Sequence, residues 1–436
     1  LILQILQVSQ HRELYMTEIK KKKKILVIAD NPLAPSGVAT QTKYMIESML
    51  KTGEYSFICL AGAIKHNDYR PMKVDPWGDD WVIFPVDGYG NHEIIRTMLY
   101  NHRPDMLWFM TDPRFYIWLW EIESEIRPHV PMIYYHVWDN YPYPTFNKPF
   151  YDSNDMVCTI SKLTDDIVRT VSPETDCRHI PHTMDMKLYK KRPLSEWHAF
   201  SKQVRKDDDD KFVVFWINRN ARRKQSGTLL FWFNKFLDKV GRDKATLVMH
   251  TEPKDPNGQD LEAIIEELNM NDGQVLLSVQ KMPDEELSKM YNLADCTINI
   301  ADAEGFGLGT LESLACETPI IVTMTGGMQE QVTNGEEWFG VGIEPASKAV
   351  IGSQDVPWIY EDRLDEDDVI DALYKLYSMS KEEREELGKK GRKHVMDNYS
   401  LAKYSGNWYQ TLAEVTEKFG SWETRKNYKS YTVEEL

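Results

Sequence analysis

The stretch CTINIADAEGFGLGTLESLACETPIIVTMTGGMQE, from Cys296 to Glu330, decides the expected fold. Its two apolar runs, CTINIA and PIIVTMT, have the length and composition of strands that are buried on both faces. Between them, a glycine-bearing loop leads into a segment of helical length. The order of strand, loop, helix and strand predicts a βα unit of a parallel sheet.

The loop of this unit has the composition of an anion site. Glycines at a strand-to-helix turn let backbone N–H groups approach a phosphate, and the helix N-terminus adds partial positive charge. Glu304 opens the loop, and Glu312 follows about two turns along the helix. The two carboxylates can therefore bind hydroxyl groups at two ends of one ligand. Alternatively, the glycines mark only a tight turn that requires a positive φ.

Short apolar runs alternate with amphipathic stretches along most of the chain, which predicts two doubly wound parallel sheets in tandem. The charge-rich segment 192–211 interrupts this alternation and is expected to approach a domain boundary. After Val341 the sequence turns polar and then becomes charged and helical. The expected strands are 25–30, 56–62, 81–86, 106–110, 131–138 and 156–161 in the first series, and 212–219, 246–250, 275–279, 296–301 and 319–325 in the second.

Composition and charge exclude several classes of protein. The 436 residues include 52 Lys and Arg and 68 Asp and Glu, for a net charge of −16. Such a summed field repels nucleic acid and anionic membranes, although a local basic cleft stays possible. With 42% hydrophobic and 28% charged residues, the composition is that of a globular protein. No apolar run approaches the ~18 residues that span a bilayer.

The cysteines and the first residues bear on location. The five cysteines are far apart and form no C-x-x-C pair, which favours free or buried thiols and a cytoplasmic location. The first fifteen residues have neither a positively charged start nor a small-residue cleavage site, which argues against a signal peptide. Because Met16 follows them, we expect residues 1–15 to be an upstream extension.

Two motifs in the opening stretch, EGFGLGTLE and GGMQE, occur in the order of a known donor-site signature. They resemble retaining GT-B glycosyltransferases of family 4, in which seven residues separate the two glutamates and a G-G-x-x-E turn follows. The resemblance implies that Glu312 binds the ribose hydroxyls of a nucleotide-sugar, while Glu304 binds the hydroxyls of the transferred sugar. The other substrate-binding residues that it implies in this stretch are Gly305, Phe306, Gly307, Leu308, Gly326 and Gly327.

A basic loop earlier in the same half strengthens the resemblance. The segment NRNARRKQSGTLL places Arg219 and Lys224 five residues apart between a strand and a helix. The family holds the nucleotide diphosphate with an Arg and a Lys at this spacing, and Arg223 is expected to join them; alternatively, these are solvated loop cations. Two fixed cations can take the leaving-group charge that other transferases give to a divalent metal. The resemblance therefore implies no metal site and no cofactor besides the UDP- or GDP-sugar substrate.

The first half resembles the family more weakly. Gly37 lies in the loop after the first strand, where the family brings a glycine close to phosphate and acceptor; alternatively, it only begins a helix. His136 and Asp139 follow a strand, where the family often places a residue that faces the transferred sugar. A lone histidine is alternatively a satisfied structural residue. The segment from Tyr404 to Val415 resembles the family's C-terminal helix, which crosses back to the first domain.

Three positions depart from the family pattern. Asn218 replaces the glycine before the diphosphate arginine, Glu317 replaces the glycine of an A-x-G-x-P turn, and Thr183 stands where the interdomain segment usually has glycine. A non-glycine residue that must adopt the left-handed conformation costs on the order of 1 kcal/mol. The local turn geometry is therefore in doubt at Thr183, whereas the charged site residues are complete.

The expected architecture is α/β of the GT-B type, with two Rossmann-like domains whose parallel sheets face an interdomain cleft. We expect residues 1–23 to be an N-terminal extension, 24–195 the acceptor domain, 196–395 the nucleotide-sugar domain and 396–436 a C-terminal helix that crosses back. The implied reaction is metal-independent transfer of a hexosyl or pentosyl group to a hydroxyl, with retention. Its expected catalytic residues are Arg219, Lys224, Glu304 and His136, with Asp139 binding substrate.

The sequence leaves the acceptor, the oligomeric state and several rival functions open. A glycan, a small metabolite, a lipid or a modified base in nucleic acid could each accept the sugar. A nucleotide-sugar epimerase and a non-catalytic nucleotide-sugar-binding subunit would use the same scaffold. A nicotinamide-dependent oxidoreductase is disfavoured, because the first βα turn, ADNPLAPSGVAT, has no G-x-G-x-x-G.

Overall fold

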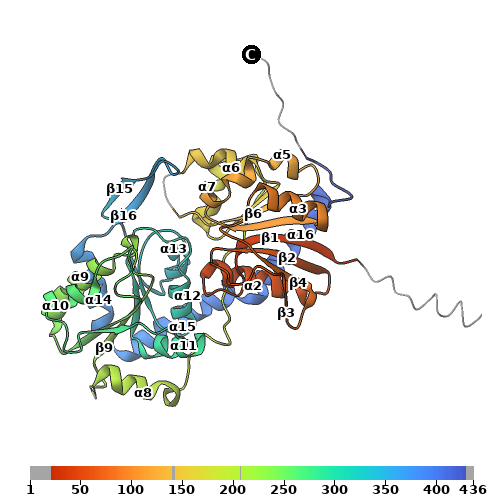
Figure 1. The fold of residues 1–436 in the computed structure, drawn as a ribbon. Helices are drawn as coiled ribbons and strands as arrows, with labels where there is room; N and C mark the ends of the chain where they lie inside the picture. Colours follow the sequence, from red (N-terminus) through yellow and green to blue (C-terminus); the bar gives the residue numbers. More distant parts are fainter. Residues whose placement is uncertain (1–20, 140–142, 207, 429–436) are drawn as a thin grey trace, which may run out of the picture. The chain divides into compact units, whose positions relative to one another are not determined.

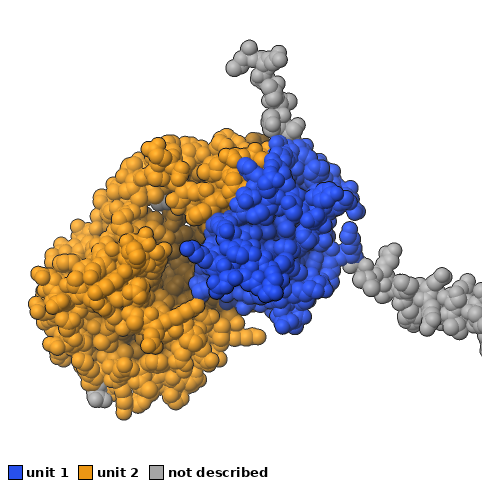
Figure 2. Space-filling view, in the orientation of Figure 1, with its two compact units in different colours: residues 1–109, 124–132, 415–436 blue, residues 110–123, 133–414 orange. Residues whose placement is uncertain are grey.

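The computed structural model describes residues 21–139, 143–206 and 208–428, so the expected extension at residues 1–15 lies outside the described residues (Figure 1). The chain forms two compact units, shown in blue and orange in Figure 2. Unit 1 comprises residues up to 109, 124–132 and from 415 onward, and unit 2 comprises 110–123 and 133–414. The domain boundaries expected from the sequence stay predictions.

Unit 1 is built around strand β1 (Lys23–Asp30), whose residues are buried from Ile25 onward. β1 pairs in parallel with β2 (Tyr55–Gly62) and with β5 (Met106–Thr111). Parallel strands require crossover connections, and helices supply them. α2 (Gly37–Leu50) joins β1 to β2, and α3 (His92–His102) follows β4 (Gly78–Pro85), which is parallel to β2. The short strand β3 (Met72–Val74) is antiparallel to β4.

Unit 2 contains a six-stranded sheet in which every pairing is parallel, with the order β11-β10-β9-β12-β13-β14. Numbered by their appearance within this sheet, the strands run 3-2-1-4-5-6, which is the Rossmann order. The order reverses between β9 and β12, and ligands bind at such a reversal, outside the carboxyl ends of the strands. The strands are β9 (Phe212–Ile217), β10 (Ala245–His250), β11 (Val275–Ser278), β12 (Cys296–Asn299), β13 (Ile320–Thr323) and β14 (Gly340–Ile343).

The core of this sheet follows from the pattern of its strands and helices. β9 is apolar on both faces and buries Val214 and Trp216. Helix α9 (Ser226–Val240) buries Leu229, Phe233 and Phe236 at the spacing of one helical face, so that these side chains pack against the strands. The sheet and its covering helices therefore form a rigid base for the loops at its edge.

The rest of unit 2 is mainly helical (Figure 1). Strands β6 (Met132–His136), β7 (Met156–Thr159) and β8 (Cys177–His179) are parallel neighbours in that order, and β15 (Ser347–Ile351) and β16 (Ile359–Arg363) form an antiparallel hairpin. The remaining short and long helices of the chain are η1 (Pro113–Phe115), α4 (Ile117–Trp120), α5 (Glu123–Ile126), η2 (Thr145–Asn147), α6 (Lys148–Asp152), α7 (Lys162–Val171), α8 (Leu194–Arg205), η3 (Arg222–Lys224), α10 (Leu261–Glu267), α11 (Asp284–Leu293), α12 (Leu308–Ala315), α13 (Met328–Val332), α14 (Glu366–Ser378), α15 (Lys381–Asn398) and α16 (Leu401–Phe419).

The expected α/β class and parallel strand series are confirmed, and each expected strand overlaps an observed one. The sequence did not predict β3, β8, β14 or the hairpin, and the charge-rich segment 192–211 includes helix α8. All five cysteines are free, and all but Cys177 are buried. No helix among the described residues combines the length and apolar character that crossing a membrane requires. A cytoplasmic location stays a prediction.

The three departures from the family pattern have different outcomes. Glu317 has a φ of 63°, so this residue does adopt the left-handed conformation. Asn218 and Thr183 are not among the described residues with a positive φ. Thr183 is instead buried and donates a hydrogen bond from Oγ1 to the carbonyl of Tyr399 at 2.7 Å. The geometry in doubt at Thr183 therefore does not need glycine.

Helix α15 packs directly on the Glu317 turn, and this contact can be tested. A Cβ at Gly388 would lie 1.9 Å from the carbonyl oxygen of Glu317, whereas a Cβ at Gly406 in α16 would meet nothing within 4 Å. Gly388→Ala should lower the free energy of unfolding by ~1–3 kcal/mol through overpacking. Gly406→Ala should raise it by up to ~1 kcal/mol, because alanine favours helix. Urea unfolding followed by circular dichroism measures both, and equal effects would contradict the contact.

Candidate functional site

The site lies at the sheet's reversal point, where the loops after β9 and β12 meet. The first loop includes η3, and the second includes the glycine-bearing turn before α12. Lys224 Nζ donates a hydrogen bond to the Glu304 carboxylate, and the Arg223 guanidinium donates to the carbonyl of Ala303. The backbone N–H of Asp302 donates to the carbonyl of Arg223 at 2.8 Å. The structure thus brings together Arg223, Lys224 and Glu304, three of the residues expected from the sequence.

The Lys224–Glu304 ion pair is shielded from water. Lys224 is only 7% exposed. Burial by itself would raise the pKa of Glu304, but Lys224 and Arg223 outweigh it, and the pKa lies below its usual value. Burial lowers the pKa of Lys224, and Glu304 opposes that change. Removing one partner would leave a buried charge without compensation, which is strongly destabilising.

The two glycine motifs pack against each other behind this pair. Gly307 and Gly326 have φ angles of 88° and 50°, which favour glycine. A Cβ at Gly326 would lie 1.7 Å from the carbonyl oxygen of Glu304, and one at Gly327 would lie 2.7 Å from Phe306 Cα. No side chain fits at either position without a shift of the loop. The first turn of α12, which begins at Leu308, follows directly, and the backbone N–H groups of a helix's first turn are able to bind an anion.

Glu312 lies on α12 and faces α11. Its carboxylate accepts a hydrogen bond of 2.7 Å from the Tyr291 hydroxyl. Burial raises the pKa of Glu312 to about 8, although hydrogen bonds from Tyr291 and Tyr189 oppose the rise. Glu312 is therefore largely protonated at neutral pH and can both donate to and accept from a ligand's hydroxyl groups. Tyr291 was missed by sequence reasoning, because nothing local relates it to Glu312.

The two remaining arginines of the basic loop, Arg219 and Arg222, form ion pairs with carboxylates other than Glu304. Arg219 is largely exposed, and its Nε donates to Asp255 Oδ2 at 2.7 Å. The structure does not place Arg219 on the Lys224–Glu304 pair, so its expected role at the diphosphate stays a prediction. Arg222, which the sequence did not single out, makes two hydrogen bonds to Glu361 on the β15–β16 hairpin.

Asp139 borders the same group of charges. Its Oδ2 lies 3.9 Å from NH1 of Arg223, and its Cβ would lie 3.6 Å from a Cβ placed on Gly326. Burial raises the pKa of Asp139, and the nearby Arg223 opposes the rise. The structure therefore brings Asp139 next to the site, and its expected contact with substrate stays a prediction.

His136 occupies a different environment. It is fully buried, with Nδ1 3.0 Å from the Tyr134 hydroxyl and Nε2 2.8 Å from the Tyr151 hydroxyl. Burial lowers the pKa of His136 to about 3, so the ring is neutral. Both ring nitrogens have protein partners, which is the arrangement of the structural alternative. The catalytic role expected for His136 stays a prediction.

Gly37 belongs to unit 1, where it is the first residue of α2. The side chain of Ser36 caps that helix by accepting a hydrogen bond from the Ala39 N–H at 3.0 Å. This position corresponds to the simpler of the two readings for Gly37, the start of a helix. Its expected contact with substrate stays a prediction.

Glu330, the glutamate of GGMQE, has a role that the motif did not reveal. Its Oε2 accepts a hydrogen bond of 2.8 Å from the backbone N–H of Lys162, in the first turn of α7. Burial raises the pKa of Glu330 to about 7, and the contact with Lys162 opposes the rise. Glu330 therefore fastens α13, next to the glycine turn, to the N-terminus of α7.

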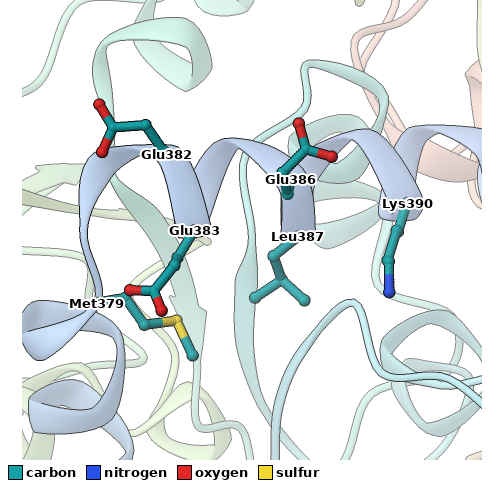
Figure 3. A pocket seen from close by; sticks show the side chains of 6 residues that line it. All are labelled: Met379, Glu382, Glu383, Glu386, Leu387 and Lys390. Atoms are coloured by element: carbon teal, nitrogen blue, oxygen red, sulfur yellow. The ribbon is translucent and has the colours of Figure 1, made fainter.

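A pocket along α15 lies apart from this site, and the described residues include no group of side chains that could hold a metal ion. A pocket of about 370 Å³ runs along α15, and it includes none of the residues expected in the site (Figure 3). Within residues 21–139, 143–206 and 208–428, no three or more His, Cys, Asp or Glu side chains are grouped so as to hold a metal ion. The residues that line the pocket are Met379, Glu382, Glu383, Glu386, Leu387 and Lys390.

Both loops of the site and both glycine motifs lie within the part of the chain that matches a known protein family. Residues 198–394 match the family Glycosyl transferases group 1. The segment that carries the site thus resembles group 1 glycosyltransferases, in line with the resemblance seen in the sequence, and the finer assignment to family 4 stays a prediction. A D-inositol 3-phosphate glycosyltransferase from Corynebacterium jeikeium is 30% identical over 141 residues. These cover 31% of this chain and 33% of that protein, so the chain spans about a third of this curated relative's length.

Solved structures match nearly the whole fold. Sucrose-phosphate synthase from Thermosynechococcus elongatus has a TM-score of 0.71 and 16% identity, with 91% of this chain and 100% of that chain covered. HepE from Anabaena, in complex with UDP and glucose, has a TM-score of 0.65 and 13% identity, with 90% and 100% covered. These likenesses confirm the expected GT-B architecture with two Rossmann-like domains.

The raised pKa of Glu312 predicts a pH-dependent stability. A carboxyl whose folded-state pKa exceeds its unfolded value stabilises the fold below the unfolded pKa, and this stability is lost as pH rises through the folded pKa. Between pH 5 and pH 9 the wild type should therefore lose ~2 kcal/mol or more relative to Glu312→Gln, since one pKa unit corresponds to ~1.4 kcal/mol. Chemical unfolding across this pH range measures the difference. The exposed Glu336→Gln serves as control, and parallel pH profiles for the wild type and Glu312→Gln would contradict the prediction.

Proposed function

We propose that this protein is a retaining glycosyltransferase that moves a sugar from a UDP- or GDP-sugar to an acceptor hydroxyl without a metal ion. The observation that carries the proposal is the convergence of Lys224, Glu304 and the N-terminus of α12 at one sheet edge. These groups lie within the segment that matches the group 1 family. The complex of HepE with UDP and glucose supports a nucleotide donor for a protein of this fold.

Each end of the donor has a matching group in the site. The diphosphate would lie against Lys224, Arg223 and the first-turn N–H groups of α12, since fixed cations and helix N-termini favour anions. Glu312 would take the ribose hydroxyls and Glu304 those of the transferred sugar. Arg219 is exposed enough to reach the diphosphate by exchanging Asp255 for it.

In the proposed reaction, the bond between the anomeric carbon and the diphosphate oxygen breaks, and a bond to the acceptor oxygen forms on the same face of the sugar. The acceptor proton passes to the departing phosphate oxygen, so no protein nucleophile is needed. The protein orients the two substrates and stabilises the charge that develops on the diphosphate. The reaction needs no proton transfer through His136, so it is compatible with the burial of that side chain.

A donor screen tests the proposal directly. UDP-glucose, UDP-N-acetylglucosamine and GDP-mannose are added to the full chain, and thermal unfolding is followed. A donor present at about 100 times its Kd stabilises the folded protein by about 2.7 kcal/mol. Each donor that stabilises the protein is then assayed for slow hydrolysis to UDP or GDP. Failure of UDP, GDP and every sugar derivative to stabilise the protein would contradict the proposal, and binding without any hydrolysis or transfer would favour a binding subunit.

The diphosphate assignment predicts the effect of removing either cation. Arg219→Ala and Lys224→Ala should each reduce turnover by ~100-fold or more, roughly 3 kcal/mol of transition-state stabilisation. Turnover is measured as sugar transfer or donor hydrolysis at saturating donor. The exposed Lys254→Ala, in a neighbouring loop, is the matched control. Because Lys224 is buried, Lys224→Met combined with Glu304→Gln avoids an unpaired charge. Near wild-type turnover in both single variants would contradict the assignment.

A further inference from the structure

The hairpin that follows β14 carries a buried carboxylate aimed at the basic loop. The Glu361 side chain on β16 is 3% exposed. It accepts hydrogen bonds from NH1 and NH2 of Arg222 at 2.9 Å and 2.7 Å, and from NH2 of Arg363 at 3.0 Å. The Arg222 guanidinium is thus bound in a two-pronged arrangement, which fixes its plane as well as its position.

The same strand is fastened to the second loop of the site. NH1 of Arg363 lies 2.7 Å from Asp302 Oδ2, and the backbone N–H of Asp362 donates to the carbonyl of Asp302 at 2.9 Å. Asp302 lies two residues before Glu304. β16 therefore contacts both loops that meet at the reversal point of the sheet, one through Glu361 and Arg222 and the other through Asp302.

The direction of Arg222 sets the directions of the next two side chains. Residues 222–224 form a 3₁₀ turn, in which successive side chains point about 120° apart. Arg222 faces Glu361, Arg223 faces the carbonyl of Ala303, and Lys224 faces Glu304. Rotation of this short turn would move all three together. The Glu361 contact opposes that rotation, as do the hydrogen bonds from the Arg222 N–H to the carbonyl of Asn257 at 2.9 Å and from the Asp302 N–H to the carbonyl of Arg223 at 2.8 Å.

We propose that Glu361 is a positioning residue for the donor diphosphate, which it serves by holding the Arg222–Lys224 turn in register with the Glu304 loop. The inference rests on the proposed function, because the diphosphate is its ligand. Glu361 need not touch the donor. Its effect reaches the ligand through Arg222, and the hairpin that carries it acts as a brace for the cations of the site.

Because Glu361 is negatively charged, a purely electrostatic role and a positioning role predict opposite effects of Glu361→Gln on diphosphate binding. Removing a negative charge beside the cations would, by simple electrostatics, strengthen binding of a diphosphate. Loss of positioning predicts the opposite sign for Glu361→Gln. Uridine lacks the diphosphate, and in the proposed binding mode its ribose contacts Glu312 and not the Arg222–Lys224 turn, so its binding separates a positioning role from general loss of structure.

The experiment measures UDP and uridine binding to the full chain by calorimetry, or GDP and guanosine binding if the wild type prefers that base. Glu361→Gln should weaken UDP binding by ~10-fold, equivalent to ~1.4 kcal/mol, and leave uridine binding within about twofold. Glu361→Asp, which keeps the charge, should restore part of the UDP affinity. Glu344→Gln, an exposed residue just before the hairpin, should change neither ligand.

A second variant guards against misfolding of the first. Arg222→Lys keeps the positive charge but loses the two-pronged contact, and it should weaken UDP binding selectively as well. Unchanged or tighter UDP binding in Glu361→Gln, or in Arg222→Lys if the former does not fold, would overturn the inference. Equal weakening of UDP and uridine would also overturn it, in favour of a purely structural role. A wild type that binds neither UDP nor GDP would refute the proposed function, and this inference with it.

Discussion

The parallel pairing of β9 with β12 is the constraint on which the site depends. Cys296 lies beside Val214 and Thr297 beside Phe215, so the two strands end at the same edge of the sheet although 78 residues of chain lie between them. The strand order reverses at this pair, and ligands bind at such a reversal in open α/β sheets; here the loops that follow β9 and β12 meet and hydrogen-bond to each other. One loop carries Lys224 and the other Glu304, and both would be displaced by any change in this register.

Each cation of the basic loop that faces the site or its rim has a carboxylate partner. Lys224 pairs with Glu304, Arg222 with Glu361 and Arg219 with Asp255, and NH1 of Arg223 lies 3.9 Å from Asp139 Oδ2. An acidic chain with a net charge of −16 can thus keep a concentrated positive loop without electrostatic strain. A diphosphate would enter this arrangement as one more anion, and it would compete with Glu304 and Asp255 for cations already fixed in place. The global charge therefore says little about which anions this edge of the sheet can hold.

Local motifs made the glycine turn and its two glutamates predictable, because backbone geometry and helix spacing act over a few residues. The partner of Arg222 was not predictable, since Glu361 follows 139 residues later in a hairpin whose strands show no regular alternation of burial. His136 illustrates another limit. Its neighbours in sequence do not reveal that tyrosine hydroxyls will occupy both ring nitrogens. Thr183 replaced an expected glycine without strain, because its hydroxyl gains a backbone acceptor.

The long separation between Arg222 and Glu361 has a consequence for synthesis of the chain. Ribosomes extend a protein from its N-terminus at about 5–20 residues per second. The basic loop and the centre of its sheet therefore emerge well before the hairpin that braces them, and for that interval Arg222 has no carboxylate of β16 to bind. Asp255 and Glu304, which pair with Arg219 and Lys224, precede the hairpin in the chain, so Arg222 is the cation whose carboxylate partner is synthesised last of the three. Completion of the hairpin therefore supplies the last of these three carboxylate partners.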